Sequence, residues 1–220
     1  MTNSTTRPAA GHARTACDTS TPCRPPTDFS AFAGQLVRSP AQIGAIAPSS
    51  RHLARAVCSP VPERGQPVVV ELGAGTGPFT AEIQRRLDGR GRHLAIEVNA
   101  TLAKLLRDRY PRVEVIQHDA AHLRQLLDER GIDRADVVIS GLPWALFPAA
   151  TQQQLMDATA TVLGPSGSFT AFTYLHAVAL TSAHRFRRLL AQRFEEVVPS
   201  RTIWRNTPPA FVLHARRPRP

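Results

Sequence analysis

A glutamate and three glycines have the types and spacing that could bind a nucleotide. Gly73, Gly75 and Gly77 alternate with other residues, and Glu71 comes two positions before the first of them. Glycine permits positive φ and lets a ligand come close to the backbone near the start of a helix. We therefore expect this segment, including Ala74, to contact a ligand. An ordinary tight turn between a strand and a helix would have the same glycine pattern.

Two further carboxylates follow at expected strand ends. Glu97, followed by Val98, lies where a carboxylate could accept hydrogen bonds from both hydroxyls of a ribose. Asp119 ends a third apolar segment, and together with the backbone of Ala120 it could hold the exocyclic amine of an adenine. Each acid alone could be a solvated loop residue. Three acids at successive strand ends beside a glycine loop indicate an adenine nucleoside.

A nicotinamide dinucleotide is the competing ligand, because its binding motif also combines a glycine turn with an acid for the ribose. The turn here reads Gly-x-Gly-x-Gly followed by Pro78, and not Gly-x-Gly-x-x-Gly. A carboxylate at Glu71 would lie unfavourably beside a pyrophosphate but favourably beside the amine or sulfonium of S-adenosylmethionine. The pattern favours S-adenosylmethionine.

The segments around these residues predict a regular alternation of strands and helices. Apolar runs predict parallel strands at 68–72, 93–97, 113–116, 135–140 and 168–174. Helical patterns lie at 79–87, around 102–106, and at 123–127, 152–163 and 183–193. A turn is expected at 164–167, and two last β segments, 197–204 and 210–215, are expected to pair as an antiparallel hairpin. The fold class is α/β, a doubly wound, mostly parallel sheet of seven strands.

Composition sets limits on the function. The 220 residues are 42% hydrophobic and 20% charged, which is typical of one soluble globular domain. The net charge of +10 predicts attraction to nucleic acid, anionic lipid or acidic small molecules. The three cysteines suggest neither a disulfide framework nor a zinc site, and no secretory signal precedes the domain, so we expect a cytoplasmic protein. His118 and His122 are four residues apart, but we do not expect a metal pair on one helix face, because His118 ends a strand.

The loop after the fourth strand is the most discriminating motif. It reads Ser140-Gly141-Leu142-Pro143-Trp144 and looks like the Asn/Asp-Leu-Pro-Tyr loop of ribosomal RNA adenine dimethylases, with Ser-Gly at its start and Trp at its end. From about Ser39 to the C-terminus the chain resembles a class I S-adenosylmethionine-dependent methyltransferase. It is more similar to the bacterial phospholipid N-methyltransferases, through the separated segments 36–40, 43–50, 140–144, 172–176 and 204–210.

This resemblance implies S-adenosylmethionine as cofactor and stepwise methylation of the phosphatidylethanolamine headgroup toward phosphatidylcholine. It implies that Glu71 and the three glycines lie along the methionine part, Glu97 at the ribose, and Asp119 with Ala120 at the adenine. Ala74, Val98 and Ser140 complete the candidate cofactor-binding residues. Other acceptors remain open: a soluble small-molecule nucleophile, or, ranked last, an RNA adenine, because the arginines are spread along the chain.

Methyl transfer to an amine needs alignment of the reactants and removal of one proton. Tyr174 and His176 could take that proton directly or through water, and Ser140 is the third candidate catalytic residue. His176 could equally be a core or surface histidine. Candidate substrate-binding residues are Leu142, Trp144, Tyr174, Arg187, Trp204 and Arg205.

The roles expected of these substrate-binding residues follow from their chemistry. Trp144 and Trp204 could form walls around a methylated cation, and arginines suit a phosphodiester. A solvated arginine face, or packing of Trp204 in the hairpin, are the alternatives.

We expect three regions along the chain. Residues 1–27 are a disordered leader rich in Thr, Pro and Ser, and residues 28–60 form a helical lid that contacts the membrane. In this second region Asp28 caps a helix bearing Phe29, Phe32, Leu36 and Val37, and Ser49 or Ser50 opens another that runs to about Val57. Residues 61–220 form the methyltransferase domain. We expect a monomer that binds anionic membrane surfaces peripherally and in a salt-sensitive way.

Overall fold

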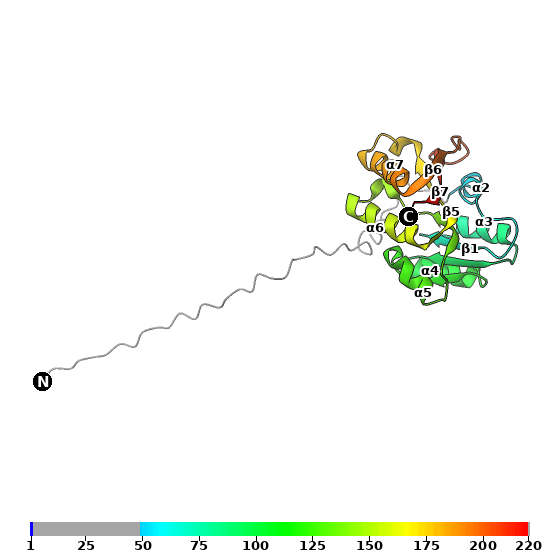
Figure 1. Cartoon of the computed structure of the whole chain (residues 1–220), viewed down its shortest axis with the longest axis horizontal. Helices are drawn as coiled ribbons and strands as arrows, with labels where there is room; N and C mark the ends of the chain where they lie inside the picture. Colours follow the sequence, from blue (N-terminus) through cyan, green and yellow to red (C-terminus); the bar gives the residue numbers. More distant parts are fainter. Residues whose placement is uncertain (2–48, 220) are drawn as a thin grey trace.

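The computed structural model describes Met1 and residues 49–219 (Figure 1). The expected leader and the expected helix after Asp28 lie outside the described residues. Ser50 caps the first described helix, α2 (Arg51–Val57), by accepting a hydrogen bond from the Leu53 N–H at 3.2 Å. The helix start predicted at Ser49 or Ser50 is confirmed.

One sheet of seven strands forms the centre of the molecule, in the order β3-β2-β1-β4-β5-β7-β6. The strands are β1 (Val68–Leu72), β2 (Arg92–Ile96), β3 (Glu114–Ile116), β4 (Ala135–Ser140), β5 (Leu163–Tyr174), β6 (Phe194–Pro199) and β7 (Ala210–Pro218). Strands β1 to β5 are parallel, and β7 runs antiparallel to both β5 and β6. The predicted doubly wound sheet with a terminal antiparallel pair is confirmed.

Helices cover both faces of this sheet (Figure 1). They are α3 (Pro78–Leu87), α4 (Ala100–Arg109), α5 (Leu123–Asp128), α6 (Ala149–Val162) and α7 (Thr181–Arg193), with short 3-10 turns η2 (Ala120–His122), η3 (Trp144–Leu146) and η4 (Leu175–Ala177). In β1, Val70 and Leu72 pack in one core with α5, α6 and α7, whereas Val69 packs in another with α2 and α3. Because both faces of the sheet are buried, its strands are apolar on both sides.

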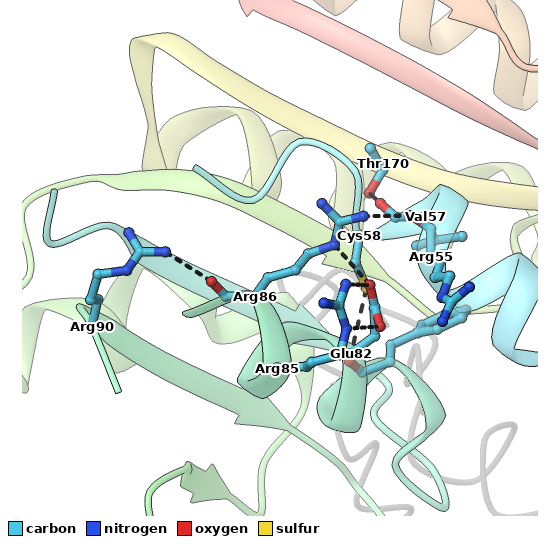
Figure 2. Close-up of polar contacts among 9 residues, drawn as sticks. Arg55, Val57, Cys58, Glu82, Arg85, Arg86, Arg90 and Thr170 are labelled. Atoms are coloured by element: carbon cyan, nitrogen blue, oxygen red, sulfur yellow. Dashed lines mark hydrogen bonds and ion pairs between the residues drawn. The ribbon is translucent and has the colours of Figure 1, made fainter. Parts of the chain in front are cut away.

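The α2 helix packs into the domain through side chains and through its end. Leu53, Ala54 and Val57 are buried in the same cluster as residues of β1 and α3. At the end of α2, the Thr170 hydroxyl donates to the Val57 carbonyl at 2.9 Å (Figure 2). Burial and the nearby Glu71 carboxylate raise the pKa of Cys58 well above its usual value, so this thiol stays neutral.

A charged cluster joins α2 to α3 at the surface. Glu82 accepts hydrogen bonds from both Arg85 and Arg86, with Nη2 and Nε respectively within 2.9 Å of Oε1, and Arg86 Nη2 donates to the Arg55 carbonyl at 3.1 Å (Figure 2). The arginine contacts hold the pKa of the Glu82 carboxyl below its usual value. The two helices are thus fixed to each other over the face that covers β1.

Most predicted boundaries shift by a few residues, and two of the differences change how a segment is assigned. The turn expected at 164–167 is an excursion within β5, because Ala135 pairs with Leu163 but Val137 pairs with Ser168. The β segment expected at 197–204 runs instead from Phe194 to Pro199 and does not reach Trp204. Its start lies earlier because Phe194, the residue after α7, already pairs with Pro218 at the end of β7.

The register of the strands places the candidate site residues at the carboxyl ends of the parallel strands. Leu72 at the end of β1 pairs with Ile96 at the end of β2 and with Ser140 at the end of β4. Ile96 in turn pairs with Ile116 at the end of β3. The loops that follow these four strands therefore converge, as the topology of the fold requires.

Candidate active site

The glycine loop after β1 is held to its neighbours by backbone contacts. Gly73, Gly75 and Gly77 all have positive φ, at 68°, 57° and 89°. A Cβ on Gly77 would lie 2.9 Å from the Tyr110 ring, so a larger residue would not fit there. A Cβ on Gly75 would meet no atom of the described residues within 4 Å, so none of these residues covers this side of the loop. A ligand can therefore approach the backbone at Gly75.

Glu97 joins this loop to the loop after β2. Its Oε2 accepts from the Gly75 N–H and its Oε1 from the Asn99 N–H, both at 2.9 Å. The side chain is buried, and burial raises the pKa of the Glu97 carboxyl, with repulsion from Glu71 adding to the effect and the backbone N–H donors opposing it. Both oxygens keep further lone pairs with which a ribose hydroxyl could bond.

Glu71 is fully buried below the glycine loop in a polar network that sequence analysis missed. With its proton on Nε2, the His93 ring donates to Glu71 Oε2 at 3.2 Å and accepts from Gln84 at 3.0 Å. The Thr80 hydroxyl donates to the same Oε2 at 2.8 Å. Among the described residues, Glu71 Oε1 has no hydrogen-bond partner. The signal in the sequence was His93, a polar residue that directly precedes the apolar run 94–96 of β2.

Asp119 lies in the loop that follows β3 and caps the turn η2. Its Oδ1 accepts from the Ala121 N–H at 2.8 Å, which fixes the carboxylate beside the buried Ala120. In the described part of the chain Oδ2 has no hydrogen-bond donor. This oxygen is therefore available to the exocyclic amine of an adenine.

The loop after β4 is built by contacts that assign Ser140 a structural role. The fully buried Ser140 hydroxyl oxygen accepts from Trp144 Nε1 at 2.9 Å and from the Leu142 N–H at 3.3 Å. A Cβ on Gly141 would lie 2.5 Å from the Gly73 carbonyl oxygen, which explains the glycine in this motif. Leu142 covers Gly73 and is nearly buried. Ser140 was expected to contact cofactor or substrate, but its hydroxyl is occupied in shaping this loop.

Trp144 lies in the core, which corrects the interpretation of its ring as a wall around a methylated cation. The side chain is 1% exposed and stacks on Phe186, with ring centroids 4.5 Å apart. Its edges meet Phe147 and Phe169. Gln152 donates to the Trp144 carbonyl at 2.6 Å, a contact that the sequence did not reveal. Because these rings surround the indole, no face is left for a substrate.

Tyr174, the last residue of β5, and His176, in the turn η4 that follows, lie side by side. Their rings are parallel within 10°, with centroids 5.6 Å apart. Tyr174 is half-buried and His176 is exposed. Burial raises the pKa of the Tyr174 phenol, so it stays protonated at neutral pH and His176 is the better proton acceptor of the two.

The remaining candidate substrate residues lie on the surface. Trp204 is 71% exposed and stands outside β6, so it does not pack within the hairpin. Arg187 on α7 and Arg205 are exposed, and neither forms an ion pair with a residue in the described ranges. The structure therefore gathers the cofactor candidates but leaves these three side chains free at the surface.

Neither a metal centre nor a membrane span is present in the part of the chain that the structure describes. No group of three or more His, Cys, Asp or Glu side chains is placed to hold a metal ion. None of the helices within residues 49–219 has both the length and the apolar character needed to cross a bilayer.

Comparison with known proteins identifies the family. Residues 69–167 match the family described as "Methyltransferase domain". The chain is 37% identical over 196 residues to the ornithine lipid N-methyltransferase of Singulisphaera acidiphila, a match that covers 86% of this chain and 96% of the relative.

Solved structures share the fold at low identity. An S-adenosylmethionine-dependent O-methyltransferase from Thermotoga maritima matches with a TM-score of 0.56 and 14% identity, over 74% of this chain and 64% of the other. A spermidine synthase in complex with the transition-state analogue AdoDATO matches with a TM-score of 0.60 and 16% identity, over 77% and 61%. The match thus spans less than two thirds of either solved chain.

The residues at the sheet edge fit S-adenosylmethionine. The open side of Gly75, the unpartnered oxygens of Glu71 and Asp119, and the buried Glu97 supply the backbone approach and the carboxylates that an adenine nucleoside with a cationic tail needs. With the fold and the matches above, they show that this chain is an S-adenosylmethionine-dependent class I methyltransferase and belongs to the family that includes the ornithine lipid N-methyltransferase.

Proposed function

We propose that this enzyme methylates the primary amine of a membrane lipid, with an ornithine-headed lipid as the favoured acceptor. The observation that carries the proposal is the similarity to the ornithine lipid N-methyltransferase over 96% of that protein's length. Phosphatidylethanolamine, the acceptor suggested by the sequence motifs, presents the same nucleophile on a different headgroup. The two lipids differ in their anionic group, which is a carboxylate in ornithine and a phosphodiester in phosphatidylethanolamine.

In this proposal the cofactor binds to groups that the fold already holds in place. S-adenosylmethionine supplies an electrophilic methyl group on its sulfonium. Glu97 would accept the ribose hydroxyls, Asp119 with the Ala120 backbone would bind the adenine, and the Gly73–Gly77 loop with Ala74 would follow the methionine part. Val98, directly after Glu97, would lie against the nucleoside. The Glu97 carboxylate already accepts a hydrogen bond from the Gly75 N–H. The same side chain would therefore position both the glycine loop and the ribose.

The acceptor half must deliver a neutral amine in line with the methyl group. His176, exposed beside Tyr174, would take the proton from the ammonium, and the protonated Tyr174 hydroxyl would orient the amine. Leu142 would exclude water from the loop that it covers. Arg187 and Arg205 are cations suited to the anionic part of either headgroup, since guanidinium binds carboxylate and phosphate in a bidentate manner.

The test is methyl transfer from labelled S-adenosylmethionine by the full chain to lipid in mixed micelles. Parallel reactions contain ornithine lipid, phosphatidylethanolamine, a soluble alkylamine or RNA, and mass spectrometry identifies the products. We expect methylated ornithine lipid as the main product. Asp119→Ala is the control, because it should abolish transfer by weakening cofactor binding.

Each other outcome contradicts part of the proposal. If methylated phosphatidylethanolamine were the main product, the acceptor would still be a lipid amine, but the proposed ornithine headgroup would be wrong. Methylation of the soluble amine or RNA alone, or no lipid product despite confirmed cofactor binding, would reject a lipid acceptor.

A further inference from the structure

Exposed apolar side chains gather near the candidate active site. Four of the large apolar side chains that the described structure leaves in solvent come from segments that follow β4, follow β5 or precede β7. They are Leu146 (38% exposed), Leu175 (41%), Leu180 (43%) and Trp204 (71%). We call this set, with the segments 141–152, 175–188 and 200–209 that carry it, the apolar rim.

The strand topology places these segments at one end of the sheet. Ser140 and Tyr174 end the parallel strands β4 and β5, and Tyr174 pairs with Ala210, the first residue of β7. The segment that leads into β7 therefore lies beside the segment that leaves β5, and the Leu175 N–H donates to the Pro209 carbonyl at 2.8 Å. The cofactor loops follow β1, β2 and β3 at this same end.

Hydrogen bonds also join the segment after β4 to the start of α7. The Ser182 hydroxyl donates to the Ala145 carbonyl, and Gln152 donates to the Ser182 carbonyl at 3.0 Å. Leu146 and Leu180 each lie within two residues of these contacts. The three segments of the rim are thus joined by hydrogen bonds, so their exposed side chains belong to one end of the domain.

The charges of the rim have one sign. Segments 141–152, 175–188 and 200–209 contain no aspartate or glutamate, but they contain Arg185, Arg187, Arg188, Arg201 and Arg205. Four of these arginines are exposed and Arg185 is half-buried. None of the five forms an ion pair with another residue in the described ranges. An apolar surface with unpaired cations is complementary to an anionic bilayer, where apolar side chains enter the headgroup boundary and arginines meet the lipid phosphates.

We propose that the apolar rim docks on an anionic bilayer, with Leu175, Leu180 and Trp204 inserted at the headgroup level. Tryptophan suits this depth because its ring is apolar and its N–H is polar. Docking in this orientation turns the cofactor end of the sheet toward the membrane, so that a lipid amine would reach the site without leaving the bilayer. That consequence rests on the proposed function, whereas the docking itself is tested without any acceptor lipid.

Trp204 is a reporter for the proposed contact. The chain has two tryptophans, and Trp144 is buried among aromatic rings at 1% exposure. Emission of the full chain is recorded while vesicles of phosphatidylglycerol and phosphatidylcholine, or of phosphatidylcholine alone, are added. We expect a blue shift, and quenching by brominated acyl chains, with the anionic vesicles alone, and weaker binding at high salt.

Matched leucine variants distinguish binding through the apolar rim from nonspecific binding by any exposed leucine. Leu175→Ser combined with Leu180→Ser should weaken partition onto anionic vesicles by about tenfold or more, because two apolar side chains no longer enter the headgroup boundary. Leu105→Ser is the control, because Leu105 on α4 is 42% exposed but lies outside the rim. Circular dichroism shows whether each variant is folded.

Three results would overturn the proposal. Vesicle binding with unchanged Trp204 emission would place the contact in another segment, and equal effects of the rim and Leu105 variants would remove its specificity. An apparent molecular mass that rises with protein concentration in the absence of vesicles, together with the same shift in Trp204 emission, would show that the rim is an interface between copies of the chain. Since these vesicles contain no amine lipid, failure of lipid methylation would not affect the result.

Discussion

Gly141 and Gly73 approach so closely that a Cβ on Gly141 would lie 2.5 Å from the Gly73 carbonyl oxygen. The loop that follows β4 and the glycine loop that follows β1 are therefore packed backbone against backbone. The Gly141 N–H also donates to the Leu72 carbonyl at 2.8 Å. Any side chain at Gly141 must move one loop away from the other.

Gly141→Ala should therefore impair both stability and cofactor binding. We expect a loss of about 1–3 kcal/mol in the free energy of unfolding, as for overpacked sites, and a weaker affinity for S-adenosylmethionine. Urea denaturation and calorimetric titration measure the two effects. Gly164→Ala is the matched control, because a Cβ there would make only ordinary contacts, with the Arg134 side chain at 3.7 Å and the Ala135 carbonyl oxygen at 4.0 Å among the described residues. Equal effects of both substitutions would contradict the packing argument.

Cofactor affinity should depend on the ionisation of Glu97. Burial raises the pKa of this carboxyl above its ordinary value of about 4.3, so acidification protonates it earlier than an exposed glutamate. A raised acid pKa means that the folded state favours the neutral form, so the cost of keeping Glu97 ionised grows as pH rises from the unfolded to the folded pKa.

Binding, which uses the carboxylate as acceptor, should be full above the folded pKa of Glu97 and lost below it. Titration of S-adenosylmethionine affinity against pH checks this. Glu97→Gln should bind weakly with little pH dependence in that range, and the exposed Glu129→Gln should follow the unmodified chain. A Glu97→Gln profile identical to that of the unmodified chain would exclude Glu97 as the titrating group.

The His93 contact with Glu71 should contribute to stability through the buried carboxylate. Among the described residues, His93→Leu leaves Glu71 with the Thr80 hydroxyl as its one donor, and we expect a loss of about 1–3 kcal/mol, the cost of an unsatisfied buried polar group. Denaturation of His93→Leu, Glu71→Leu and the double variant forms a cycle. The double variant should lose less than the sum of the single variants, and strict additivity would mean that the two side chains are not coupled.

Trp144 should matter for folding and not for substrate affinity. Trp144→Ala removes a ring stacked on Phe186, and a loss of about 3–5 kcal/mol is expected for such a core truncation. Trp144→Phe keeps most of the packing but removes the Ser140 hydrogen bond. We expect a smaller loss and an unchanged KM for the acceptor, measured by denaturation and by kinetics. A raised KM with unchanged stability would return Trp144 to the substrate site.

His176 and Tyr174 should affect the pH profile of catalysis differently. His176→Ala should lower kcat and remove the pH dependence that a general base gives to the reaction. Tyr174→Phe should lower kcat without moving that profile, because the phenol stays protonated throughout the range. Steady-state kinetics between acidic and mildly basic pH check both. An unchanged His176→Ala profile would assign proton removal to water or another group.

The sequence alone determined the architecture and the edge at which the cofactor binds. Apolar runs separated by helical patterns predicted the parallel strands, and the topology of such a sheet brings Gly73, Glu97 and Asp119 together at the ends of strands. These features are local in the chain or follow from strand order, so they can be deduced without coordinates.

Only the tertiary structure decided which polar and aromatic side chains face the site. Trp144 donates a hydrogen bond to the Ser140 hydroxyl, and His93 on the next strand contacts Glu71. Trp204 is exposed to solvent, although the sequence predicted it to lie in a strand. Each outcome depends on how segments distant in sequence pack. A residue's type gives its capacity to bond, but its neighbours in the fold determine whether that capacity is used within the protein or left for a ligand.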